Sequence, residues 1–286
     1  MTGASMVDVV TLGLSTPEAV PLYHVTPGGL LGRVLLPAGR DLGLDCDWAE
    51  ICTMDALVQA NRSLPPERIL AILGDAGVDS ILLDGVEACR SPGYSMLVAA
   101  ARGHGVPVGL RLHGSCRPDV SADFILVDYV ERIGGRQTAP EVVDLIRWAG
   151  EHGVMVEVNA YIDRAEPTLI LPIAEATRDA GGALHVHMPH DMGARSLYEW
   201  LERHGPPYSY LHTPGYRVED TRCPSCRSIV AVRERNTLAR LTLRDGRCPR
   251  CGAEIRIVGR VYERTRREYY RVTRGATQWL HPAKLG

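Results

Sequence analysis

The chain has 286 residues, which is enough for one large domain and one small domain. No apolar run reaches the ~18–20 residues that span a membrane, and residues 1–10 lack the basic flank of a secretory signal peptide. These features exclude a membrane partner and lead us to expect a cytoplasmic protein.

Charge is distributed unevenly along the sequence. Residues 1–216 carry 15 basic and 27 acidic side chains, whereas residues 217–286 carry 17 basic and 7 acidic side chains. A basic tail could bind the phosphates of a nucleic acid, or it could dock on an acidic protein surface, including the body of its own chain. Because the tail contains no recognisable base-reading element, we favour a protein partner over nucleic acid.

Short β-rich runs alternate with longer helical runs over most of the chain. Residues 1–30 form a lead-in that prolines and glycines interrupt. We expect strands at 33–37, 79–84, 106–112, 122–128, 153–160, 183–188 and 208–212, and helices at 65–76, 95–104, 140–152, 167–180 and 194–204. This alternation predicts βα units around a mainly parallel sheet. With seven strands, we interpret residues 31–216 as an incomplete (β/α) TIM-like barrel.

Two Cys-x-x-Cys pairs lie in the basic tail: Cys223 and Cys226, then Cys248 and Cys251 after 21 intervening residues. Four thiolates at this spacing are typical of a structural zinc site, and two disulfides in a secreted protein are the alternative. Strand-like runs at 229–232 and 238–243 lie between the pairs. We therefore predict a zinc ribbon over residues 217–286, with an added strand or short hairpin at 261–273.

The other four cysteines follow the first three predicted strands of the barrel. They are Cys46, Cys52, Cys89 and Cys116. Loops that follow adjacent strands of a barrel are neighbours, so these thiols could hold a second metal or a rearranged iron–sulfur cluster. Isolated cysteines also occur as small buried hydrophobic residues, and that alternative stays open.

Three histidines near the end of the sixth predicted strand could form another metal site. His185 and His187 are two residues apart and therefore face the same side of a strand, and His190 follows them. The alternative, which we favour, is that they are polar interior residues that hydrogen-bond to each other or to water. The barrel interior could then bind a polar small molecule.

The fifth predicted strand alternates between polar and valine positions. Glu157 and Asn159 share one face with Met155, and the valines between them suit packing beneath helices. We expect Glu157 and Asn159 to line the interior, either as ligand-binding groups or as buried, hydrogen-bonded side chains.

Several of these segments, in this order, resemble one family. The sequences PLYHVTPGG at 21–29 and RVLLPAG at 33–39 resemble the first-strand region of the AmmeMemoRadiSam group of radical S-adenosylmethionine (SAM) enzymes, relatives of pyruvate formate-lyase activating enzymes. Residues 122–128, 153–159, 185–190 and 208–216, followed by Cys223, are similar to later strands and the terminal zinc-ribbon-like segment. The resemblance implies a radical SAM barrel with SAM and a [4Fe–4S] cluster. It also implies that Glu87, Glu157 and Asn159 lie near the bound SAM.

The chain departs from that family at the cluster motif. Family members bind the cluster through Cys-x-x-x-Cys-x-x-Cys, and the corresponding positions here are Arg40, Leu44 and Asp47. Neither arginine nor leucine can supply a cluster ligand. We therefore expect a degenerate, non-catalytic member that acts as a binding or assembly partner. The alternatives are a metalloenzyme with a rearranged site, an unrelated α/β enzyme, and a nucleic-acid-associated zinc-ribbon protein.

Overall fold

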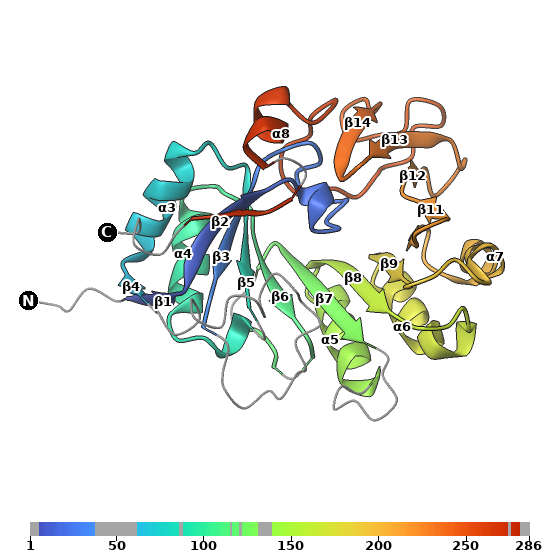
Figure 1. Ribbon diagram of the computed structural model, residues 1–286, viewed down its shortest axis with the longest axis horizontal. Coiled ribbons are helices and arrows are strands. Elements are labelled where there is room, and N and C mark those ends of the chain that lie inside the picture. Colours follow the sequence, from blue (N-terminus) through green and yellow to red (C-terminus); the bar gives the residue numbers. More distant parts are fainter. Residues whose placement is uncertain are drawn as a thin grey trace, which may run out of the picture.

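A mixed sheet of ten strands forms the centre of the molecule (Figure 1). The structure is a computed structural model that describes residues 6–37, 62–85, 88–114, 116–119, 122–130, 139–273 and 276–280. The strand order is β11-β10-β9-β8-β7-β6-β5-β3-β2-β15. No pairing among the described strands joins β11 to β15, so the sheet is open in this part of the chain.

Seven of these strands run parallel and follow one another in chain order. They are β3 (Leu31–Leu35), β5 (Ser80–Asp84), β6 (Val108–Leu112), β7 (Phe124–Val130), β8 (Met155–Tyr161), β9 (Ala183–His187) and β10 (Tyr208–His212). This confirms the predicted α/β class and its parallel sheet. Curvature into a TIM-like barrel remains a prediction.

Five α-helices connect the parallel strands. They are α3 (Pro66–Asp75), α4 (Tyr94–Gly103), α5 (Ala139–Glu151), α6 (Pro167–Asp179) and α7 (Ala194–His204). Each predicted helix is present, and α7 and β10 have the predicted bounds. The helices lie along one side of the sheet in Figure 1. Alternate strand residues, among them Val156 and Val158, pack with them in a single large apolar cluster, because successive side chains of a strand point to opposite faces.

The lead-in and the tail both add strands to the sheet. β2 (Thr11–Ser15) pairs antiparallel with β3, β15 (Gln278–Trp279) pairs with β2, and β11 (Arg217–Val218) pairs with β10. The division into residues 1–30, 31–216 and 217–286 remains a prediction. Near the N-terminus, β1 (Val7–Val9) pairs with β4 (Arg62–Leu64), and the lead-in also contains the short helix η1 (Pro17–Ala19).

A three-stranded antiparallel sheet lies on the opposite side of the main sheet from the helices (Figure 1). It consists of β12 (Thr221–Arg222), β13 (Ile229–Glu234) and β14 (Thr237–Leu241). Arg235 and Asn236 connect β13 to β14 with φ angles of 48° and 62°, which suit a tight hairpin turn. This sheet and the lead-in cover the main sheet, whose inner residues Phe124 and Met155 pack in one cluster with Cys223 and Cys248.

The prediction of a strand or hairpin at 261–273 is wrong. The structure has helix α8 (Arg267–Thr273) there. Its two buried residues, Tyr269 and Thr273, are four positions apart and therefore share one helical face, which the alternating appearance of the sequence concealed. No helix in the described ranges is both long enough and apolar enough to cross a membrane.

Candidate functional site

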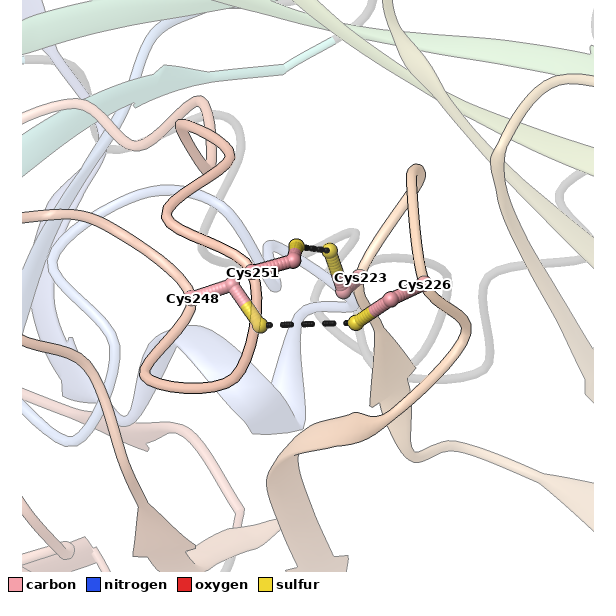
Figure 2. Close-up of side chains that lie close together, drawn as sticks. All are labelled: Cys223, Cys226, Cys248 and Cys251. Atoms are coloured by element: carbon pink, nitrogen blue, oxygen red, sulfur yellow. Dashed lines mark hydrogen bonds between the residues drawn. The ribbon is translucent and has the colours of Figure 1, made fainter.

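The four cysteines of the tail come together in two facing turns (Figure 2). The Sγ atoms of Cys223 and Cys251 are 3.5 Å apart, those of Cys226 and Cys248 are 3.7 Å apart, and all four lie within 4.8 Å of one another. Tetrahedral zinc with Zn–S bonds of about 2.3 Å requires sulfur atoms roughly 3.8 Å apart. The four thiols therefore fit a metal of this size and geometry.

The two turns repeat the same backbone pattern. The N–H of Arg227 donates to the carbonyl of Cys223, and the N–H of Gly252 donates to the carbonyl of Cys248. Arg227 and Gly252 both have positive φ, at 60° and 76°. The fourth residue after each leading cysteine thus reverses the chain so that both sulfurs of a pair point the same way.

The hydroxyl of Ser228 lies between the two turns. Its oxygen is 3.0 Å from Sγ of Cys226 and 3.4 Å from Sγ of Cys248. This hydrogen bond lowers the pKa of the Cys248 thiol to about 6, because it stabilises the thiolate. In the described ranges, these cysteines are the one group of His, Cys, Asp and Glu side chains that converges for a metal ion.

The inner face of the main sheet carries a buried row of paired charges near the carboxyl ends of its strands. Arg33 on β3 donates to Asp84 on β5, with 2.6 Å from Nε to Oδ2. Arg111 on β6 donates from Nε to Oδ2 of Asp128 on β7 at 2.7 Å and lies 3.6 Å from Asp84. Burial raises the pKa of Asp84, but Arg33 and Arg111 outweigh it and hold that pKa below its usual value.

The row continues onto β8 and β9. Nδ2 of Asn159 donates to Asp128 at 3.2 Å, and Oδ1 of Asn159 is 3.1 Å from Nε2 of His187. The ring of His187 stacks on that of Tyr161 with centroids 4.6 Å apart. Both the Nδ2 and the Oδ1 atoms of Asn159 are therefore hydrogen-bonded to other side chains of the chain.

Glu157 is fully buried beneath this row and holds the lead-in segment. Its two oxygens accept hydrogen bonds from the backbone N–H groups of Tyr23 and His24, each at 2.8 Å. Oε2 also lies 3.0 Å from Nε2 of His185. Burial raises the pKa of Glu157 because the charged form loses its hydration.

A chain of hydrogen bonds leads from Glu157 through two histidines to Glu219. Nδ1 of His185 is 3.1 Å from Nε2 of His212, and Nδ1 of His212 is 3.1 Å from Oε1 of Glu219. The hydrogen bond from His212 and the charge of Arg217 outweigh burial and lower the pKa of Glu219 to about 2, so that carboxylate only accepts.

One assignment of protons satisfies this whole chain. His212 donates from Nδ1 to Glu219 and accepts at Nε2 from Nδ1–H of His185. Nε2 of His185 then accepts a hydrogen bond from the protonated carboxyl of Glu157, consistent with the raised pKa of that group. Burial lowers the pKa of both histidines, so both rings are neutral. The arrangement thus links the buried Glu157 to Glu219, which is partly exposed, through two neutral imidazole rings.

Arg233 joins the ribbon to this face. It lies on β13 and is 7% exposed. Its guanidinium donates to the carbonyls of Tyr23 and Glu219, each at 2.9 Å, and to the hydroxyl of Thr221 at 2.7 Å. It also lies over the Tyr23 ring at 3.9 Å, which is a favourable cation–π distance.

The structure places the predicted site residues in different surroundings. Cys89, in the short helix η2 (Ala88–Arg90), and Cys116 form a disulfide, while Cys46, Cys52 and Glu87 lie outside the described residues. The positions that correspond to the family's cluster cysteines, Arg40, Leu44 and Asp47, also lie outside them.

The histidine trio does not converge on one point within the described ranges. His185 and His187 face the same side of β9, as predicted, but each bonds to groups other than His190. Glu157 and Asn159 do line the inner face, where residues of the chain itself engage them.

Sequence reasoning missed the paired charges of Arg33, Asp84, Arg111 and Asp128. A signal was present, because each is a charged residue within or at the end of a largely apolar predicted strand. Their mutual pairing required the strand order, which periodicity alone does not supply.

The fold and these sites define an α/β protein with a large, parallel-rich sheet and a four-cysteine cluster near its C-terminus. No protein-family model and no curated protein sequence matches the chain.

Among solved structures, the chain is similar to Streptococcus suis SuiB. The crystal structure of SuiB bound to S-adenosylmethionine is 16% identical, with a TM-score of 0.40 over 52% of this chain and 41% of that chain. A second SuiB structure is 15% identical, with a TM-score of 0.41 over 53% and 44%. SuiB bound to its precursor peptide SuiA is 13% identical, with a TM-score of 0.41 over 54% and 43%. The chain thus spans less than half the length of the SuiB chains that it matches.

Proposed function

We propose that this chain is a non-catalytic binding or assembly protein, built on a radical-SAM-like α/β sheet and stabilised by a structural zinc ion in its ribbon. The observation that carries the proposal is the occupation of the inner face by the chain itself. Glu157, whose position the family resemblance assigns to SAM binding, instead binds the backbone of Tyr23 and His24 and the ring of His185. A ligand that used Glu157 would have to displace the lead-in.

The charged groups of the inner face support the same conclusion. Arg33 and Arg111 are paired with Asp84 and Asp128, and Asn159 bridges Asp128 to His187. Separating a buried, hydrogen-bonded charge pair leaves an uncompensated charge, so breaking these pairs to admit a ligand costs free energy. We assign this row to structural support of the sheet.

The cysteines argue against the family's redox chemistry. The three cluster positions hold Arg40, Leu44 and Asp47, and Cys89 is bonded to Cys116. We therefore propose neither a [4Fe–4S] cluster nor SAM as a cofactor of this chain.

Zinc is the cofactor that we propose. Cys223, Cys226, Cys248 and Cys251 would hold it, and the ion would supply folding free energy to the ribbon rather than chemistry. Cys223 and Cys248 are buried in the cluster that also contains Phe124 and Met155, so the metal would fix the layer that covers the main sheet.

Metal content tests this proposal. We expect about one zinc and no iron per chain after anaerobic purification and reconstitution with iron and sulfide, together with no reductive cleavage of SAM. Cys251→Ser should lose the zinc, and Ser225→Ala, in the same ribbon but with an exposed side chain, should keep it. Cys251 suits the test because it is exposed, so the substitution removes a ligand with little effect on packing.

Two results would contradict the proposal. Iron near four per chain that is lost in a Cys46→Ser/Cys52→Ser variant would make the chain an enzyme with a rearranged cluster. Full zinc retention in Cys251→Ser would show that the four cysteines do not act as one site.

A further inference from the structure

The outer surface of the ribbon and α8 is rich in arginine. Ten exposed arginines lie between β13 and the end of α8, and only Arg266 forms an ion pair with an acidic residue in the described ranges. They are Arg235, Arg240, Arg244, Arg247, Arg250, Arg260, Arg264, Arg266, Arg267 and Arg271. Four exposed acidic residues lie in the same stretch. The surface therefore carries an excess of positive charge that the ribbon itself does not neutralise.

A hollow of about 420 Å³ opens in this surface. It is lined by Thr237 and Leu238 of β14, by Thr265, and by Arg267, Tyr270 and Arg271 of α8. The last three residues are spaced three and four positions apart, so they share one face of the helix. Tyr269 and Thr273 are buried on the other side and fix the orientation of that face.

The walls of the hollow are held together by hydrogen bonds. Leu238 donates its backbone N–H to the hydroxyl of Thr265 at 2.8 Å and accepts from the backbone N–H of Thr265 at 2.8 Å. Tyr270 is 48% exposed, with no hydrogen bond to its hydroxyl among the described residues. The hollow thus presents an accessible aromatic ring between two guanidinium groups on a fixed support.

We propose that this hollow binds a single-stranded nucleic acid, with a base stacked on Tyr270 and the adjoining phosphates paired with Arg267 and Arg271. Aromatic rings that stack on bases within a positively charged groove are the common means of binding single strands without reading their sequence. Arg235 and Arg240 lie on the same hairpin as Thr237 and Leu238, where they would meet further phosphates.

The structure removes the reason for preferring a protein partner for this tail. That preference rested on the lack of a recognisable base-reading element, but stacking on an exposed aromatic ring requires no such element. Helix α8 supplies one, because it separates the exposed Tyr270 from the buried Tyr269. The carboxylates of an acidic peptide could also pair with the arginines, but they would not stack on the exposed ring of Tyr270.

Fluorescence anisotropy of a labelled oligouridine tests the proposal with the full-length chain. We expect binding that weakens with salt, and a salt slope that falls by roughly 1.4 in Arg267→Ala/Arg271→Ala, because each phosphate contact on a single strand contributes about 0.7. Tyr270→Leu should weaken binding at least roughly fivefold, whereas Tyr270→Phe, which keeps the ring, should retain it. Arg68→Ala/Arg195→Ala, with two exposed arginines on α3 and α7, is the matched control and should bind as the unmodified chain does.

Three outcomes would overturn the proposal. The first is no binding at low salt. The second is equal weakening in the control and the Arg267/Arg271 variant, which would indicate diffuse attraction to charge. The third is equally tight binding of a labelled polyglutamate, with no effect of Tyr270→Leu on either ligand, which would make this an acidic-peptide surface. Zinc content and melting temperature, measured on each variant, should match the unmodified chain because these side chains are exposed.

Discussion

Arg233→Met should lower the free energy of unfolding by about 3–5 kcal/mol, because it removes three buried hydrogen bonds to a charged group. The substitution keeps an unbranched apolar stem and removes the guanidinium and its charge. It abolishes three hydrogen bonds, of 2.9, 2.7 and 2.9 Å, and leaves the carbonyls of Tyr23 and Glu219 without this donor. It also removes the positive charge over the Tyr23 ring.

The magnitude follows from these contacts. A hydrogen bond to a charged group contributes about 1.5–3 kcal/mol, and the three bonds of Arg233 belong to one network, so we expect a total below the simple sum of their contributions. The assay is urea unfolding followed by far-UV circular dichroism, with zinc content measured on the same samples. Arg240→Met on the neighbouring strand β14 is the control, and because its side chain is exposed we expect a change within about 0.5 kcal/mol.

The predicted coupling is refuted if Arg233→Met retains its zinc and loses less than about 1 kcal/mol of unfolding free energy. That result would mean that the contacts to Tyr23 and Glu219 do not couple the ribbon to the main sheet. A loss of similar size in the Arg240 control would also refute it, because the effect would then reflect the ribbon's general charge.

Two further predictions concern other buried groups. Burial raises the pKa of Glu18 from 4.5 to about 7, so ionising this group costs folding free energy and wild-type stability falls as pH rises through that interval. The Gln side chain of Glu18→Gln cannot ionise. The unfolding free energy of this variant, relative to wild type, should therefore rise by roughly 3 kcal/mol between pH 4 and pH 8. Parallel curves of unfolding free energy against pH for the two proteins would contradict this prediction. Cys89→Ser should cost roughly 3–4 kcal/mol without reductant, because the Cys89–Cys116 bond closes a loop with a sequence separation of 27. Cys89→Ser/Cys116→Ser should cost no more than either single change, and additive losses would show that the two cysteines act separately.

Local sequence patterns predicted the main elements. A strand or helix that is buried on one face has periodic apolar residues, and a strand buried on both faces is a short continuous apolar run. Val154, Val156 and Val158 alternate with the polar residues of β8, and this alternation gave both the strand and the face that packs beneath helices. Helix α8 was missed because its buried residues, Tyr269 and Thr273, are too few to reveal a helical period beside so many charged neighbours. Strand β15 has only two residues and owes its pairing with β2 to tertiary contact.

The candidate sites also differ in how far the sequence predicts them. The cysteine cluster was predictable because each pair lies within one turn of chain, so spacing alone fixes half of the geometry. Glu157 was predicted to line the interior, and it does. Its partners could not be predicted from the sequence. Tyr23 is 134 residues away, and their pairing depends on the lead-in folding over the inner face of the sheet.

The contacts around Glu157 form a closed cycle that joins the ribbon to the sheet. Arg233 binds the carbonyl of Tyr23, Tyr23 donates its N–H to Glu157, and Glu157 continues through His185 and His212 to Glu219. The carbonyl of Glu219 returns to Arg233. The bonds of Tyr23, Glu157 and His185 join residues that are distant in sequence, so the lead-in cannot leave without breaking bonds to the sheet and to the ribbon. The ribbon and the inner face should therefore unfold in a single transition, and this cooperativity is what a zinc ion in the ribbon would stabilise.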